Sequence, residues 1–113
     1  MQQATHRRIL DSSANPAALG LLCFGMTTVL LNLANAGIVS LSVTVMAMGI
    51  FLGGLAQVIA GILESKKNNT FGMTAFTSYG FFWISLVCIW ILPKTGLAPA
   101  ADDVSMGYYL SVW

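Results

Sequence analysis

Two long stretches of the chain, residues 12–63 and 68–93, contain no Asp, Glu, Lys, Arg or His. A helix that crosses the hydrocarbon core of a bilayer needs roughly 20 predominantly apolar residues. The first stretch has room for two such helices and the second for one. Only 8% of the chain is charged, whereas a soluble globular domain is about a quarter charged. The sequence therefore predicts an all-α membrane protein.

The apolar runs predict spanning helices near 17–35, 39–63 and 71–92, within a partial transmembrane domain at 15–113. Residues 106–113 are apolar but too few to cross the bilayer. They predict either the start of a fourth helix in a truncated chain or an interfacial aromatic anchor. The Ala34-Asn35-Ala36 pattern also occurs at signal-peptide cleavage sites, but the polar residues inside the first run favour a spanning helix.

The basic residues are distributed unevenly between the two sides of the membrane. Arg7 and Arg8 precede the first predicted span, and Lys66 and Lys67 follow the second, which returns the chain to the same side. Lys94 alone follows the third span. Because Lys and Arg are enriched in cytoplasmic loops, we expect a cytoplasmic tail at 1–14 and a cytoplasmic loop at 64–70.

The polar residues of the first span gather on one side. At about 100° per residue, one arc of the helix holds Gly20, Phe24, Thr27, Thr28, Leu31, Asn32 and Asn35. Polar groups within a bilayer face protein or a water-filled path. Hydrogen bonding between helices and lining of a path are both consistent with this arc.

The second span carries small residues at helical spacing. Gly49 and Gly53 form one pair, and Ala56 and Ala60 form another; such pairs allow close helix packing. Gln57 lies on the same arc, where a buried amide needs hydrogen-bond partners. Glu64, at the end of the span, is consistent with a solvated side chain.

The third span separates a mildly polar strip from an aromatic strip that contains Phe76, Tyr79, Trp83 and Trp90. Aromatic side chains at helical spacing usually pack or meet lipid. Before the first span, Asn15-Pro16 is a strong helix start, because Asn is a good N-cap and Pro suits the first turn. The free N–H groups of such a helix start can also attract anions.

Other function classes lack support. The sequence has no phosphate-binding, dinucleotide-binding or metal-binding motif and no nucleophile–base pair, so we expect no enzyme, no catalytic residues, no metal and no cofactor. A net charge of +1 gives no argument for nucleic-acid binding.

The segment NPAALGL at 15–21 resembles the NPAPLGL signature of the acetate uptake transporter family, also called the succinate–acetate permease or YaaH-like family. The resemblance continues through FGMTTVLLNL, MAMGIFLGGLAQVIAGILE, NTFGMTAFTSYGFFW and GYYLSVW, at 24–33, 46–64, 69–83 and 107–113. Ala18 stands where the signature has a second Pro, which we expect to leave the entrance less rigid.

The resemblance implies the first half of a six-helix transporter or channel bundle in the inner (cytoplasmic) membrane. Members form homo-oligomers, as hexamers, and move acetate, succinate and other small carboxylates; channel and proton-symport accounts both exist. By motif position, Phe24 and Tyr79 would pinch the path, together with a residue of a later helix. The Asn15-Pro16 turn would belong to the cytoplasmic entry region.

We therefore expect carboxylate transport through a path pinched by Phe24 and Tyr79, with polar lining from Asn15, Thr27, Thr28, Asn32 and Gln57. Glu64 is the in-chain candidate for proton coupling. The alternative is a truncated membrane protein that transports nothing and associates with other subunits through the face containing Gly49 and Gly53.

Overall fold

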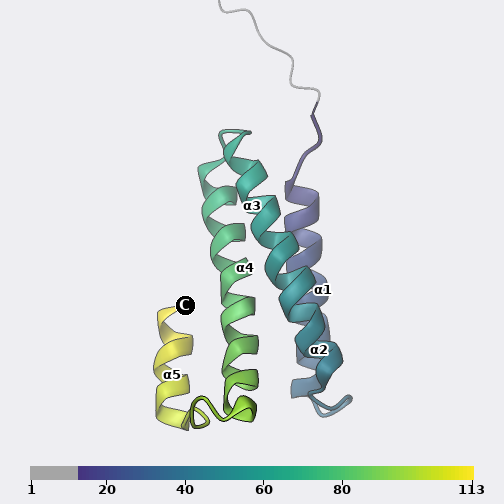
Figure 1. Ribbon diagram of the computed structural model, residues 1–113. Helices are drawn as coiled ribbons and strands as arrows, with labels where there is room; N and C mark the ends of the chain where they lie inside the picture. The colour runs from purple at the N-terminus through teal and green to yellow at the C-terminus, as the bar shows by residue number, and fades with distance from the viewer. Residues whose placement is uncertain (1–12) are drawn as a thin grey trace, which may run out of the picture.

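The computed structural model describes residues 13–113, in which every regular element is a helix. Three antiparallel spans and a shorter fourth helix follow one another, which confirms the predicted all-α membrane architecture (Figure 1). The elements are α1 (Ala17–Asn35), α2 (Val43–Met48), η2 (Gly49–Ala56), α3 (Gln57–Ser65), α4 (Thr70–Ile91), η3 (Leu92–Thr95) and α5 (Asp103–Val112). The second span is the continuous run α2–η2–α3, in which η2 is π-helical.

Two helix starts differ from the sequence prediction. The second span begins at Val43 instead of residue 39. Gly37, two residues after the end of α1, has a φ of 81°, which is not compatible with a continuing α-helix. Ser42 then caps α2 by accepting a hydrogen bond from the Thr44 N–H at 3.4 Å. The fourth helix begins at Asp103 instead of residue 106, because Asp102 provides its cap.

The beginning of α1 and the turn between α3 and α4 lie at the same end of the bundle (Figure 1). The Lys67 ammonium donates a hydrogen bond to the Ser13 carbonyl at 3.1 Å, which joins these two segments. Asn68 takes a left-handed conformation with φ 58°. Asn69 then starts α4, its side-chain oxygen accepting from the Gly72 N–H at 3.0 Å.

Small residues of the second span face the chain's own helices. A Cβ on Gly53 would lie 2.7 Å from Thr27 Cγ2 and 2.9 Å from Trp83 Cγ. Gly49 packs against Val87 in the same way, and Ala60 is fully buried. The small-residue face is thus occupied within the chain, by α1 and α4. It is not a surface open to another subunit, as the alternative hypothesis required.

Gly80 allows a close backbone approach between α4 and the second span. A Cβ at this position would lie 2.8 Å from the Gly54 carbonyl oxygen and 2.9 Å from the Val58 nitrogen. Because backbone atoms cannot move aside without separating the helices, Gly80→Val should destabilise the bundle by about 3 kcal/mol. Unfolding in mixed micelles measures this effect. Gly25→Val is the matched control, since no other described residue, apart from the adjacent backbone of α1, lies within 4 Å of a Cβ placed at Gly25. Equal stability of the two variants would contradict the prediction.

Helix α5 lies beside the second half of α4 (Figure 1) and contacts it through side chains. The Tyr109 ring stacks on Phe82 with centroids 6.0 Å apart, and Trp113 meets Phe82 edge-on at 5.5 Å. The Tyr109 hydroxyl also shares a hydrogen bond with the Ser85 hydroxyl. These contacts hold the C-terminal end of α5 to α4.

The cap of α5 should make its N-terminal turn sensitive to acid. Hydrogen bonds from the Ser105 side chain and backbone lower the pKa of Asp102 below its ordinary value of 3.8. Because the folded-state pKa is depressed, the cap stabilises α5 above pH 3.8 and is lost as the pH falls through the lowered value. Backbone chemical shifts of Ser105 should therefore move towards coil values in acid. Asp102→Asn, which retains an N-cap side chain, should abolish this pH dependence; a persisting transition would contradict the assignment.

Candidate functional site

A pocket of about 340 Å³ lies between α1, α3 and the first half of α4. It occupies the end of the bundle at which α1 begins and α3 turns into α4. Its lining residues are Ala17, Leu21, Phe24, Gln57, Glu64, Asn69, Phe71, Gly72, Ala75, Phe76 and Tyr79. Most of them are apolar, so the few polar atoms decide which solute the pocket can hold.

Phe24 and Tyr79, which the family resemblance implied as a constriction, come together on this pocket. Their ring centroids are 5.3 Å apart with an interplanar angle of 55°. Both rings stay partly exposed, at 38% and 42%. Phe24 comes from α1 and Tyr79 from α4, roughly 10–15 Å along each helix from its start. The two rings therefore lie well inside the membrane-spanning part.

Two polar side chains of α3 line the same pocket. Gln57 is 1% exposed and Glu64 is 2% exposed. They are seven residues apart, about two helical turns, and so share one face of α3. Gln57 Oε1 and Glu64 Oε2 are buried and have no hydrogen-bond partner within residues 13–113. The interpretation of Glu64 as a solvated side chain is therefore wrong.

The first turn of α4 packs directly on the Glu64 carboxyl group. A Cβ on Gly72 would lie 2.7 Å from Glu64 Oε2 and 2.5 Å from Asn69 Nδ2, so only a glycine leaves room for both side chains. The positive end of the α4 dipole thus meets a carboxyl oxygen. Among residues 13–113, none of those that line this pocket carries a positive side chain.

Three of the predicted polar lining residues do not reach this pocket. The Thr27 and Thr28 hydroxyls donate to the Cys23 and Phe24 carbonyls, both at 2.7 Å. The Asn32 amide donates to the Thr28 carbonyl at 3.0 Å. Thr27 is buried against Gly53, whereas Asn32 is exposed. Their assignment as path lining stays a prediction.

Asn15 lies beside the pocket and not within its lining. Its side-chain oxygen accepts a hydrogen bond from the Ala17 N–H at 3.0 Å. Pro16 has helical backbone angles and its carbonyl accepts from the Gly20 N–H. The Asn15-Pro16 pair therefore starts α1, and Ala17, the residue that Asn15 caps, belongs to the pocket wall.

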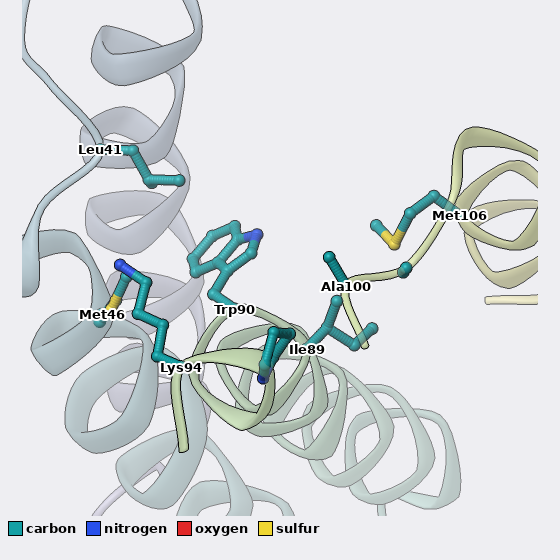
Figure 2. A pocket seen from close by; sticks show the side chains of 9 residues that line it. Leu41, Met46, Ile89, Trp90, Lys94, Ala100 and Met106 are labelled. Carbon is teal, nitrogen blue, oxygen red and sulfur yellow. The ribbon is translucent and has the colours of Figure 1, made fainter. Parts of the chain in front are cut away.

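A second pocket, of about 420 Å³, lies at the opposite end of the bundle. Figure 2 shows Lys94 extending towards Met46, next to Trp90, with Leu41 above them and Met106 on the far side. None of these residues belongs to the predicted site. Lys94 supplies the one cationic side chain of this wall.

Sequence reasoning missed the residues of α4 that surround Glu64. Asn69 is a favoured N-cap residue directly before an apolar run, and this signal places the start of a helix there. Since α3 ends only a few residues earlier, that start must lie close to Glu64. Helical periodicity does not predict this contact. It also does not predict that Trp83 Nε1 is buried and has no hydrogen-bond partner in the described part of the chain.

A sequence model described as the GPR1/FUN34/yaaH family matches residues 1–113. The chain belongs to this family. It is 59% identical over 100 residues to the succinate-acetate/proton symporter SatP of Escherichia coli K12, covering 88% of this chain and 53% of that protein. It is 42% identical over 108 residues to the ammonia transport outward protein 2 of Saccharomyces cerevisiae, covering 88% of this chain and 38% of that protein.

A solved structure of the bacterial acetate channel SatP superposes on this chain with a TM-score of 0.88 and 58% identity. The match covers 90% of this chain and 56% of that chain. The chain therefore spans about half the length of the bacterial proteins to which it is similar. Its three spans and α5 have the arrangement found in part of that channel.

Proposed function

We propose that this chain forms part of a transmembrane path for acetate and other small carboxylates, such as succinate. The supporting observation is the Phe24–Tyr79 ring pair, 5.3 Å apart, on a pocket that also contains two buried polar side chains. Rings at this depth narrow a path to the size of a small solute. The names of the bacterial relatives, an acetate channel and a succinate-acetate/proton symporter, support the same substrate class.

Glu64 is proposed to carry the proton that accompanies the carboxylate. An ionised Glu64 would repel an anion in the same pocket, because no lining side chain compensates the charge. One proton shared between Glu64 and the substrate removes this repulsion and gives the unpartnered Oε2 a hydrogen bond. Substrate entry should therefore be linked to uptake of one proton.

Ammonium is a second candidate solute, favoured by the same polar atoms. Gln57 Oε1 and the oxygens of an ionised Glu64 can accept hydrogen bonds, and the rings of Phe24 and Tyr79 could attract a small cation. The name of the yeast relative agrees with this candidate. Uptake of labelled methylammonium distinguishes it from carboxylate transport.

Further features of the complete transporter are proposed from the family resemblance. We place the chain in the cytoplasmic (inner) membrane, with its N-terminal tail in the cytoplasm, because the Lys66-Lys67 turn is the most basic described loop. Assembly as a homo-oligomer, specifically a hexamer, is proposed from the same resemblance.

The test is uptake of radiolabelled acetate at acidic external pH in a host without acetate carriers. One culture expresses this chain alone. Another expresses this chain joined to the C-terminal half of the E. coli relative, here called the hybrid transporter. Membrane levels of both proteins are measured, and cells with an empty vector give the background.

We expect the hybrid transporter to take up acetate above background, with faster uptake at acidic than at neutral external pH. Uptake by the chain alone would show that these spans assemble a path by themselves. If neither protein takes up acetate at a verified membrane level, the carboxylate proposal fails, and a non-transporting membrane protein becomes the better account. Methylammonium uptake without acetate uptake would favour the second candidate.

A further inference from the structure

The second span contains an eight-residue π-helical segment, η2, directly before the pocket residues of α3. π-Helices are rare and mostly occur as single turns inside α-helices, often at functional sites. The residue that follows η2 is Gln57, whose side chain lines the pocket. The segment therefore joins α2, the α-helical start of the span, to the pocket residues of α3.

From Gly49 onwards, one side of the second span packs on α4. Within η2, a Cβ on Gly49 would meet Val87, and a Cβ on Gly54 would meet Ile84. After η2, a Cβ on Gly61 would meet Thr77. Further along, Glu64 contacts Gly72. The partners descend in order along α4, so one face of the span follows α4 from Gly49 to Glu64.

A regular α-helix could not produce this continuous face. The buried residues before η2 or at its start are Val45 and Gly49, and those after it are Gln57, Ala60, Gly61 and Glu64. At roughly 100° per residue, the mean directions of these two sets differ by about 90° on a regular helix. That angle is close to the rotation that one residue adds about the axis of a regular α-helix. A π-helical turn holds more residues than an α-helical turn. One extra residue in such a turn removes the difference between the directions of the two buried sets.

We propose that η2 sets the rotation of α3 about its axis, and that this rotation turns Gln57 and Glu64 into the pocket. With an uninterrupted α-helix and the same sequence, packing of Gly49 on α4 would direct Glu64 roughly 60° away from Gly72. The residues of η2 thus act as positioning residues for a site that they do not touch.

Gly54 is the residue of η2 that makes the wider turn compatible with close packing. A Cβ on Gly54 would lie 2.8 Å from the Gly49 carbonyl oxygen, five residues earlier, and 2.5 Å from Ile84 Cγ1. A side chain here would collide both with the turn and with α4. The glycine therefore permits the π-helical geometry and the α4 contact together.

Single-residue deletions in the full 113-residue chain test the proposal. Phe51 in η2 and Ile59 in α3 are 64% and 53% exposed, so neither deletion removes a core side chain. Deleting Phe51 takes out the extra residue, and the span becomes a regular helix with both buried faces kept on α4. Deleting Ile59 leaves η2 unchanged and rotates Glu64 by about 100° away from the pocket.

The readout is alkylation of a cysteine at position 64 by a water-soluble maleimide in lipid vesicles. The Glu64→Cys reporter is placed in a Cys23→Ala, Cys88→Ala background, which removes both native thiols. This readout reports the geometry of the pocket whichever solute it binds, so it is independent of the proposed function. Circular dichroism verifies the helical content of each variant.

We expect deletion of Phe51 to leave the alkylation rate within about twofold of the parent, and deletion of Ile59 to raise it by about tenfold, since a buried thiol reacts only on local opening. A third variant adds one Ala after Phe51 to the Ile59 deletion and should restore slow alkylation. Faster alkylation after deletion of Phe51 than after deletion of Ile59 would overturn the proposal. Failure of the added Ala to restore slow alkylation would also overturn it.

Discussion

Glu64→Gln should lower acetate uptake by the hybrid transporter by roughly 10- to 100-fold, since a hydrogen bond to a charged group contributes about 1.5–3 kcal/mol. The substitution keeps the shape of the side chain and removes the carboxyl group, which we propose carries the proton. Uptake that remains should also lose its dependence on external pH. Initial rates of labelled acetate uptake across a range of external pH measure both effects.

The control for this substitution is Ser65→Ala. Ser65 is adjacent to Glu64, but it is exposed and donates its hydroxyl hydrogen bond to the Ile62 carbonyl of its own helix. The control should transport acetate with the parental rate and pH profile. Should Glu64→Gln retain that profile, Glu64 does not carry the proton. An uptake rate that falls while the pH profile stays unchanged would assign Glu64 a purely structural role.

Phe24→Ala should remove one side of the proposed constriction and relax the selection of solute by size. The ring meets Tyr79 at 5.3 Å and lines the pocket. We expect the ratio of butyrate to acetate uptake to rise by about tenfold, which corresponds to roughly 1.4 kcal/mol of discrimination. Competition between labelled acetate and unlabelled acids of increasing length provides the measurement in the hybrid transporter.

Phe81→Ala is the matched control for the constriction. Phe81 is 51% exposed and does not line the pocket that contains Phe24. This variant loses the same ring from a surface position and should keep the parental preference for acetate. A similar change of preference in both variants would show that the selection by size does not depend on the Phe24–Tyr79 pair.

The number and approximate positions of the spans were predictable from the sequence because charge is so costly inside a bilayer. Asp11 and Glu64 bound one charge-free stretch, and Lys67 and Lys94 bound the other. The start of the second span was not predictable from hydropathy, since residues 39–42 are apolar or small yet not helical. The Ser42 cap determines that boundary, and capping is a local hydrogen-bond choice that composition does not report.

The candidate site was only partly predictable. A helical wheel correctly grouped Gln57 with Glu64, which are seven residues apart, but it placed Tyr79 on a strip expected to pack or meet lipid. Only the family resemblance paired Tyr79 with Phe24. The burial of Glu64 depends on Gly72, a contact between two helices that no single-helix periodicity contains. The π-helical turn was also missed, because the wheel assumes the same rotation at every residue.

The self-contained hydrogen bonding of α1 has a consequence for biogenesis. The hydroxyls of Thr27 and Thr28 and the amide of Asn32 donate to carbonyls one turn earlier in the same helix. Both hydroxyls and one N–H of the Asn32 amide are therefore satisfied as soon as α1 forms, and lipid does not have to solvate these donors. The first span can leave the translocon and enter the bilayer before the later spans have been synthesised. Association with its neighbours then proceeds between helices that are already inserted.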